Sequence, residues 1–513
     1  MPFNKLFSWI IKKRVHQIEL FKEHPIDVQR DVFQELIQSA FLTEFGKQHR
    51  FRDISEFKDF QKAVPLQTYD DLKPYVDRLK EGEQNLLWPT EINWFAKSSG
   101  TTSNKSKLIP VSRESLESCH YKGGKDLLGM YYTSHPKTKL FSGKHLIIGG
   151  SSRINHINRD SYFGDLSAII IKNLPWWCEF RRTPSKETAL LDQWEEKIER
   201  LSMETAKEDV HILAGVPSWT MVLIKRILEM HGTDNIFDIW PNLELFMHGG
   251  VSFEPYKDQY KKLLPRTSMN YVETYNASEG FFGIQDRTGA DDMLLMLDYG
   301  IFYEFIPMAE FEKENPTVLT LADIELGTNY AIVISTNGGL WRYVIGDTIK
   351  FTSRYPYRIQ ITGRTTNYIN AFGEELIVEN ANKAFTNACE KCNADLKEYT
   401  GAPIYMNLNS TGGHEWLVEF NRKPENLDYF IKTFDQELMA VNSDYEAKRV
   451  KSLIIQEPII RIVPDGTFYE WLKSKGKLGG QYKIPRLSNN RDLIDEIKAH
   501  TAVHSNDRLI IPA

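Results

Sequence analysis

We predict an α/β fold with a large N-terminal domain, which contains mixed sheets and a β-rich section, and a smaller α+β C-terminal domain. Three observations support this prediction. The length of 513 residues allows two to four domains, each with its own core. Strand-like and helix-like segments alternate between residues 144 and 278, and strand patterns dominate residues 293–363. The chain after them has helices and strands of its own, so we place the domains at 1–366 and 367–513.

The first 90 residues predict helices. Apolar residues recur at helical spacing in "DVQRDVFQELIQSAFLTEF" (27–45) and "DLKPYVDRLKEG" (71–82). The start, "MPFNKLFSWIIKKRVHQIELF", has a short apolar run followed by Lys12, Lys13 and Arg14. A secretory signal places its positive charge before the apolar run. We therefore expect an amphipathic N-terminal helix that packs on the body of the protein.

The alternating segment predicts a sheet with helices between its strands. We expect strands at 144–150, 210–216, 243–250 and 268–278, and helices at 186–206 and 218–230. In such sheets, ligands bind outside the carboxyl ends of the strands. Polar residues that follow these strands are therefore candidates for a functional site.

The last two parts of the chain differ in their patterns of strands and helices. Strand patterns at 293–308, 330–336, 339–351 and 357–363 form the β-rich section. The C-terminal domain is expected to have helices at 378–392 and 425–441 and strands at 414–420 and 452–463. We find no internal repeat and no low-complexity linker.

Composition excludes several classes of function. The net charge of −6 provides no positive field that would recruit nucleic acid. No run approaches the 18 or so apolar residues that a membrane span needs. Four cysteines in so long a chain do not make a disulfide framework, which favours a reducing compartment and a cytoplasmic location. Cys389 and Cys392 form a C-x-x-C without the partners of a zinc site, so we interpret them as helix neighbours.

The stretch "FAKSSGTTSNKSKLIPVS" (95–112) places hydroxyl side chains around Gly100 and two lysines after them. Hydroxyls, free backbone N–H groups and ammonium groups suit a phosphate chain, although a solvated surface loop has the same composition. A Walker loop would need Gly where Lys105 stands. The pair Gly149–Gly150 is too little for G-x-G-x-x-G, and "NASEG" lacks the first glycine of G-x-S-x-G.

Four further polar clusters stand out. "MHGGVSF" (247–253) offers a glycine turn that a flat ring could approach, and "TYNASEG" (274–280) joins an aromatic residue, a hydroxyl and Glu279. "WRYVIGDTI" (341–349) presents Asp347, whose carboxylate could accept bonds from two ribose hydroxyls, and "GGQYKIPR" (479–486) presents Lys483. Taken singly, each cluster could equally be a turn, a helix cap or a solvated cation.

Taken together and in order, these motifs resemble the adenylate-forming enzymes of the acyl-CoA synthetase and luciferase superfamily. Within it, "SSGTTSNKSKLIP", "YNASE", "GLWRYVIGD" and "QYKIPR" resemble the auxin-responsive (Gretchen Hagen type) acyl acid amido synthetases, over residues 95 to 490. The chain departs from the family at Asn104, where Gly is usual, at Trp341, where Tyr is usual, and at Val344, where plant members have Arg. The acyl-pocket pattern of the plant enzymes cannot be matched, so the identity of the acid does not carry over.

The resemblance implies a ligase with two half-reactions. A carboxylic acid attacks the α-phosphate of ATP to give an acyl-adenylate and pyrophosphate, and an amine, such as an amino acid, then displaces AMP to form an amide. Lys483 would neutralise the α-phosphate and the attacking carboxylate, and Glu279 would ligate Mg²⁺. The implied nucleotide-binding residues are Ser98, Ser99, Gly100, Thr101, Thr102, Lys107, Gly249, Gly250, Tyr275, Ser278, Arg342 and Asp347.

Within this set, Ser99, Thr101, Thr102 and Lys107 would hold the β- and γ-phosphates. Gly249, Gly250 and Tyr275 would frame the adenine, and Asp347 would bind the ribose. Lys483 belongs to the small domain, so a hinge near residues 365–371 would have to close the site for adenylation.

Two alternatives remain open at this point. An acyl-CoA ligase shares the first half-reaction but uses a thiol acceptor, and the residues do not distinguish the two acceptors. A non-catalytic nucleotide-binding protein on the same fold is the other, although the presence of Lys483, Glu279 and Asp347 together argues against it. The oligomeric state cannot be read from the sequence, and a monomer is the default.

Overall fold

The computed structural model describes residues 2–98, 107–149, 154–174, 178–191, 193–365, 367–408, 410–449, 452, 454–475 and 484–504. Two compact units can be distinguished. The first holds Met1–Ser98, Lys107–Phe253 and Tyr260–Thr365. The second holds Thr366–Ala513 together with the short segment Glu254–Gln259. Each unit is described by itself below.

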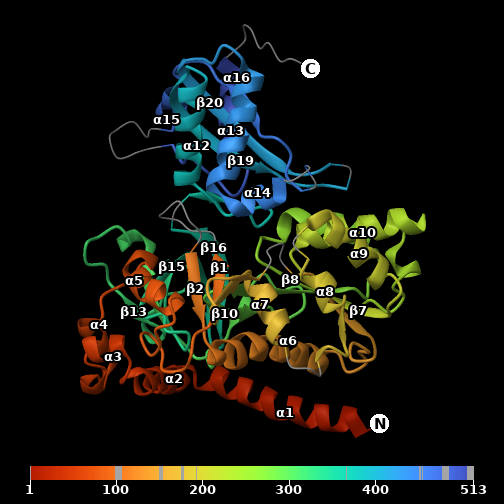
Figure 1. Cartoon of the computed structure of the whole chain (residues 1–513), viewed down its shortest axis with the longest axis vertical. Coiled ribbons are helices and arrows are strands. Elements are labelled where there is room, and N and C mark those ends of the chain that lie inside the picture. Colours follow the sequence, from red (N-terminus) through yellow and green to blue (C-terminus); the bar gives the residue numbers. More distant parts are fainter. Residues whose placement is uncertain are drawn as a thin grey trace. The chain divides into compact units, whose positions relative to one another are not determined.

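The predicted N-terminal helices are confirmed. They are α1 (Pro2–Glu23), α2 (Pro25–Ala40), α3 (Glu44–Gln48), α4 (Phe57–Ala63) and α5 (Tyr69–Lys80). In Figure 1, α1 lies along α6 (Tyr121–Ser134). Arg14 of α1 fixes this packing, because its guanidinium binds Asp126 at 2.6 Å and Asp298 at 2.5 Å. Ile18 and Phe21 belong to the same helix and are buried, as expected for an amphipathic helix packed on the body of the protein.

A twelve-stranded sheet runs through the first unit, in the order β13-β12-β14-β15-β16-β11-β10-β9-β8-β7-β3-β6. Its strands are β3 (Lys144–Ile147), β6 (Arg182–Thr183), β7 (Val210–Gly215), β8 (Leu245–Gly249), β9 (Asn270–Ala277), β10 (Gly280–Ile284), β11 (Met293–Leu295), β12 (Ile301–Pro307), β13 (Leu319–Thr320), β14 (Asn329–Thr336), β15 (Tyr343–Arg354) and β16 (Tyr357–Arg364). From β6 to β9 neighbouring strands pair parallel, and from β9 to β13 they pair antiparallel. The mixed sheet and the β-rich section are therefore two halves of one sheet.

The remaining elements of this unit surround the large sheet. A four-stranded sheet has the order β2-β1-β5-β4, with β1 (Trp94–Ser98), β2 (Lys107–Val111), β4 (Asn155–His156) and β5 (Tyr162–Gly164). A π-helical turn, Ser115–His120, leads into α6. The other helices are α7 (Leu166–Asn173), α8 (Lys186–Ala189), α9 (Trp194–Thr205), α10 (Pro217–His231) and α11 (Lys257–Leu263).

The single helix predicted at 186–206 is wrong, because the structure has two helices there, α8 and α9. The tertiary contacts explain the break. The Ser185 hydroxyl caps α8 by accepting from the Thr188 amide, and Glu204 of α9 accepts bonds from the Ser185 amide and the Thr188 hydroxyl. These bonds hold a one-turn helix against α9, and helical spacing alone cannot reveal them.

Apolar side chains from the N-terminal helices and the β-rich half of the sheet form one continuous core. Trp341 lies inside it, stacked on Phe45 and edge-on to Phe51, with its indole N–H donating to the Leu87 carbonyl at 3.1 Å. The core thus accommodates tryptophan at the position where the resemblance leads one to expect tyrosine.

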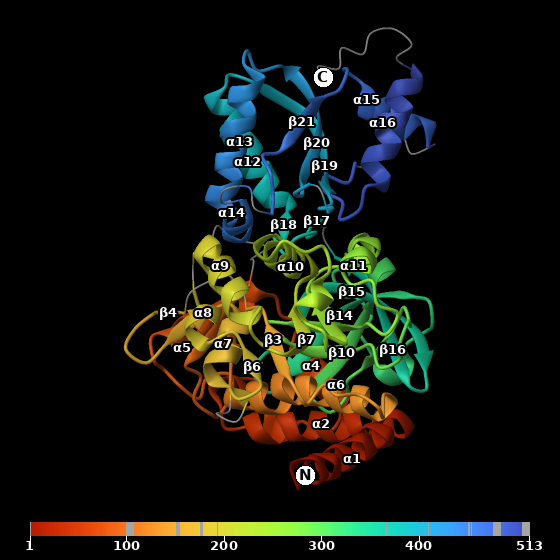
Figure 2. The same ribbon diagram turned by 90° about the vertical axis from the view of Figure 1, so that its right-hand side faces the viewer.

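The second unit is a small α+β structure, as predicted. Strands β19 (Asp395–Ile404), β20 (Gly413–Arg422) and β21 (Ile459–Ile462) form its main sheet, and β17 (Tyr368–Ile369) pairs with β18 (Leu376–Ile377). Its helices are α12 (Val378–Lys391), α13 (Leu427–Val441), α14 (Ser443–Arg449), α15 (Thr467–Ser474) and α16 (Asp492–His504). Figure 2 shows α12 and α13 on one side of this sheet and α15 and α16 on the other. The sequence predicts a strand at 452–463, but the strand in the structure, β21, is shorter and covers only Ile459–Ile462.

Candidate active site

The Gly249–Gly250 turn lies at the carboxyl edge of the parallel half of the sheet. Gly249 is the last residue of β8 and pairs with Thr274 of β9. A Cβ atom on Gly249 would lie 2.4 Å from the Thr274 carbonyl oxygen, and Gly250 has a φ of +82°. Both positions therefore require glycine for backbone reasons. The turn lies at the edge where ligands of such sheets bind.

Tyr275 and Asp347 are brought together by this edge. The Tyr275 hydroxyl donates to Asp347 Oδ2 at 2.6 Å, and Arg364 Nε lies 3.1 Å from Asp347 Oδ1. Burial and the neighbouring Asp347 charge raise the pKa of Tyr275 well above its ordinary value. Tyr275 is therefore protonated at neutral pH and acts as a fixed donor that orients the carboxylate.

The hairpin of β15 and β16 sets the position of Asp347. Asp347 follows Gly346, which has a φ of +96°, and it pairs across the hairpin with Arg364. Because opposite residues of an antiparallel pair place their side chains on the same face, the carboxylate and the guanidinium meet. A carboxylate held by both a phenol and a guanidinium suits the binding of vicinal hydroxyls, as expected for a ribose.

Lys107 is buried at the start of β2, with only 8% of its surface exposed. Its Nζ lies 3.5 Å from the Tyr343 hydroxyl and over the rings of Tyr69 and Tyr343, at 5.8 Å and 6.0 Å from their centroids. Ring faces attract a cation without neutralising it. The ammonium of Lys107 is therefore held between two aromatic rings at the start of β2.

Glu279 occupies the tight turn between β9 and β10, next to Ser278. Burial raises the pKa of Tyr343 well above its ordinary value, and the Glu279 charge adds to this shift, as it also does at Tyr275. Glu279 thus lies close enough to both tyrosines for its charge to raise their pKa values.

No cluster of three or more metal-ligating side chains occurs in the described part of the chain. Glu279 is the carboxylate that the sequence predicts to ligate Mg²⁺.

The other predicted site residues fall into two groups. Ser98 is half-buried at the end of β1, whereas Ser99, Gly100, Thr101, Thr102 and Lys483 lie outside the described residues. Arg342 is not brought to the carboxyl edge of the sheet. Its guanidinium binds the buried Glu304 of β12 through Nε and Nη2 at 2.9–3.1 Å, and Nη1 donates to the carbonyls of Val64 and Gln61.

Two residues of this site were not anticipated, Arg364 and Tyr343. Arg364 follows "ITG" at the end of β16, and its role depends on the strand register that sets it opposite Asp347. A signal existed, since one "G-D" and one "G-R" dipeptide lie in two consecutive strand patterns. In the sequence, Tyr343 cannot be distinguished from an ordinary aromatic residue of the core. Its place in the site becomes evident from the Lys107 ammonium over its ring.

Two buried histidines, His120 and His248, lie in the same part of the fold as Asn276 and Gly249. Burial lowers the pKa of His120 to about 4, although its bond to Asn276 opposes the shift, and burial lowers that of His248 to about 3. Both are therefore neutral at physiological pH. Within the described residues, no helix is both long and apolar enough to cross a bilayer.

Solved structures of two kinds share this fold. The "GH3.15 acyl acid amido synthetase" superposes with a TM-score of 0.59 at 19% identity, over 92% of this chain and 93% of that one. A 2-hydroxyisobutyryl-CoA ligase superposes with a TM-score of 0.57 at 12% identity, over 94% and 93% of the two chains. The fold is therefore that of the adenylate-forming enzymes, a class that includes amido synthetases and acyl-CoA ligases.

Three domain profiles identify the family. They are the GH3 family N-terminal domain over residues 14–269, the central domain over 294–364 and the C-terminal domain over 379–492. The chain belongs to the GH3 family. Among its relatives in Arabidopsis thaliana, the indole-3-acetic acid-amido synthetase GH3.3 is 24% identical over 90% of this chain and 89% of its own. The 4-substituted benzoates-glutamate ligase GH3.12 is 23% identical over 90% and 92%.

Proposed function

We propose that this protein is an acyl acid amido synthetase, which activates a carboxylic acid with ATP and transfers the acyl group to an amino acid. The observation that carries the proposal is the Asp347 carboxylate, which Tyr275 and Arg364 hold within an adenylate-forming fold. Relatives named as amido synthetases and as a glutamate ligase cover nine-tenths of the chain and favour an amino acid as the acceptor.

Each residue has a defined part in this proposal. Asp347, held by Tyr275 and Arg364, accepts bonds from the ribose hydroxyls. Lys107 supplies positive charge to the phosphates, and Glu279 holds Mg²⁺, which would neutralise charge on the phosphates when bound. The Gly249–Gly250 turn lets the adenine lie against the main chain. We retain Ser98–Thr102 and Ser278 as phosphate- and nucleotide-binding residues, and Arg342 as a support of the site through Glu304.

Lys483 completes the adenylation step in this proposal. Its ammonium would stabilise the negative charge that grows where the acid carboxylate attacks the α-phosphate. Such a charge-assisted contact contributes roughly 3–4 kcal/mol, or about 10²–10³ in rate. Because Lys483 follows residue 366, we also propose that a hinge within 365–371 delivers it to the nucleotide.

An ATP–pyrophosphate exchange assay tests the first half-reaction. Wild type would be given a panel of indole, aromatic and fatty acids and compared with Lys483→Ala and with Lys423→Ala, an exposed lysine of the same unit. We expect exchange that requires an acid, falls about 10²–10³-fold in Lys483→Ala and is unchanged in the control. Exchange that persists in Lys483→Ala, or none with any acid, would contradict the proposal.

The acceptor is tested by AMP release in the second half-reaction. Amino acids or coenzyme A would be added separately to enzyme that has ATP and the active acid. Stimulation by an amino acid, with an amide product seen by mass spectrometry, supports an amido synthetase. Stimulation by coenzyme A alone would instead favour the thioester ligase that the fold also allows.

The cysteines bear on the cellular location of the protein. The four cysteines are all free, which suits a reducing compartment. We propose a cytoplasmic location and a monomer, and cell fractionation with size-exclusion chromatography would test both.

A further inference from the structure

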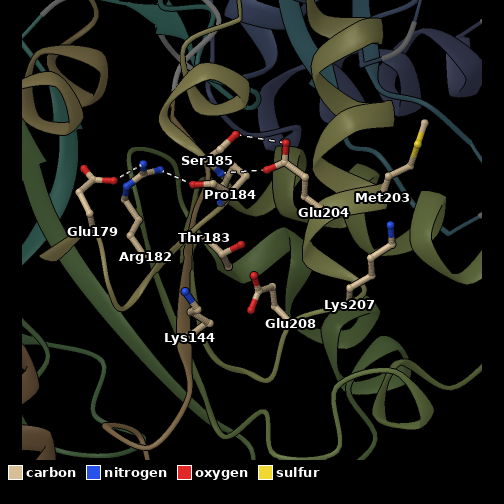
Figure 3. Close-up of a pocket in the computed structure, with 10 residues that line it drawn as sticks. All are labelled: Lys144, Glu179, Arg182, Thr183, Pro184, Ser185, Met203, Glu204, Lys207 and Glu208. Carbon is tan, nitrogen blue, oxygen red and sulfur yellow. Dashed lines mark hydrogen bonds and ion pairs between the residues drawn. The ribbon is translucent and has the colours of Figure 1, made fainter.

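A polar cavity of about 470 Å³ lies away from the candidate active site (Figure 3). Its walls come from the start of β3, from β6 and the turn before α8, and from the end of α9. Strands β3 and β7 run parallel, and the cavity lies where both begin, whereas Gly149 and Gly215 mark where they end. The length of β3 alone separates the two edges by about 13 Å, so the cavity is a separate site.

Arg182 provides a buried positive charge in the cavity wall. Its side chain is only 1% exposed, and it binds Glu179 Oε2 at 2.7 Å and the Pro184 carbonyl at 2.6 Å. The Nε atom of Arg182 has no hydrogen-bond partner among the described residues. That atom is itself buried, so the Arg182 guanidinium adds positive charge to the cavity wall rather than a donor that a ligand could reach.

Two lysines supply donors. Lys144 Nζ donates one bond, to the Phe180 carbonyl at 3.2 Å, which leaves two of its hydrogens available. Lys207 lines the same cavity and is exposed, and within the described residues its ammonium has no ion-pair or hydrogen-bond partner. The cavity therefore presents donors from two lysines, beside the buried charge of Arg182.

The three carboxylates of the lining differ in what they can still accept. Glu204 already accepts from the Ser185 amide at 2.9 Å and from two hydroxyls, and Glu179 binds Arg182 and Lys186. Glu208 has no such partner within the part of the chain that the structure describes, and in Figure 3 it projects towards Thr183. One carboxylate thus remains for a cationic group.

The formal charges of this lining cancel, with three cations and three carboxylates around the cavity. A ligand with a large net charge of either sign would be opposed by half of the lining, whereas a ligand with one carboxylate and one ammonium group matches both. We propose that the cavity binds a free amino acid as its zwitterion, with the carboxylate against Lys144 and Lys207 and the ammonium group against Glu208. This binding needs neither ATP nor an acid, so it does not rest on the proposed reaction.

Equilibrium dialysis of the full-length protein without ATP tests this inference, with each standard amino acid in radiolabelled form. We expect at least one amino acid to bind saturably. Binding should weaken roughly threefold to tenfold in Lys207→Met and in Glu208→Gln, since each removes one charge-assisted contact. The matched control Lys58→Met, an exposed lysine of α4, should bind as wild type does.

Competition separates the zwitterion from its parts. Acetate, methylamine and inorganic phosphate each supply one kind of charge, so none should displace the bound amino acid at equal concentration. The inference would be overturned by an absence of saturable binding, by binding that both cavity variants leave unchanged, or by full displacement with acetate or phosphate. Pyrophosphate exchange in the same two variants should match wild type, so failure here remains distinct from failure of the proposed reaction.

Discussion

Replacement of Arg342 by methionine is expected to unfold the first unit more easily without a direct effect on nucleotide binding. The guanidinium of Arg342 is 4% exposed and its partner Glu304 is fully buried. The substitution removes three bonds to the carboxylate and two to main-chain carbonyls. Glu304 then remains in the core with a charge that no cation balances.

The magnitude follows from the burial of the pair. Removal of one partner from a buried ion pair costs about 3–5 kcal/mol, because the other charge stays desolvated. For a unit of this size, that loss lowers the melting temperature by roughly 4–7 °C. The double variant Arg342→Met/Glu304→Met replaces the pair with apolar volume and should recover most of the loss.

The pH dependence of the single variant provides a second test. Burial already raises the pKa of Glu304, and without Arg342 only a hydrogen bond with Gln61 still opposes that shift. A carboxyl with a raised pKa stabilises the fold when protonated and loses that contribution as the pH rises. The deficit of Arg342→Met should therefore be smaller at pH 5 than at pH 8.

Calorimetry of wild type and both variants measures these changes, together with the KM for ATP in pyrophosphate exchange. We expect the melting temperature to fall and the KM at low temperature to change less than threefold. An unchanged melting temperature with a KM raised more than tenfold would refute the reasoning and restore the nucleotide contact that the motif implies.

Three further changes have clear expected outcomes. Lys107→Met should reduce pyrophosphate exchange by about 10²–10³-fold with an unchanged circular dichroism spectrum, because the phosphates lose a desolvated cation. The pKa of Glu374 lies below its ordinary value of 4.5, because bonds from His414 and two backbone amides outweigh the opposing effect of burial. The protein should therefore lose stability as the pH falls below about 4.5. Glu374→Gln should flatten that acid limb and cost about 2–3 kcal/mol in urea titrations at pH 7. Gly249→Ala should destabilise by about 1–3 kcal/mol, because its Cβ overlaps the Thr274 carbonyl.

Much of the site could be predicted because it depends on local patterns. Apolar runs such as "LELFMHGG" specify buried parallel strands, and the carboxyl ends of such strands share one edge. That rule places Gly249 near Tyr275 before any coordinates exist. The glycine before Asp347 likewise indicates the sharp turn that presents the carboxylate.

The remainder depends on register and on the direction of side chains. Arg342 lies within a motif of the candidate site, yet its side chain points into the core, where the buried Glu304 attracts it. Arg364 reaches Asp347 only because two irregularities in the β15–β16 pairing align residue 347 with residue 364. Hydrophobic spacing predicts neither the direction in which a single side chain points nor the number of bulges in a strand pair.

The hairpin of β15 and β16 also indicates where the protein can be altered safely. Its tip, around Tyr355, is exposed by 71% and lies at the opposite end of the two strands from Asp347 and Arg364. Extra residues at the tip, such as a fluorophore tag or an affinity peptide, would leave the pairing of the strands intact. Deletion of one residue inside either strand would turn the carboxylate or the guanidinium to the opposite face of the sheet. A reporter placed at Tyr355 could therefore follow events at the nucleotide without altering the groups that bind it.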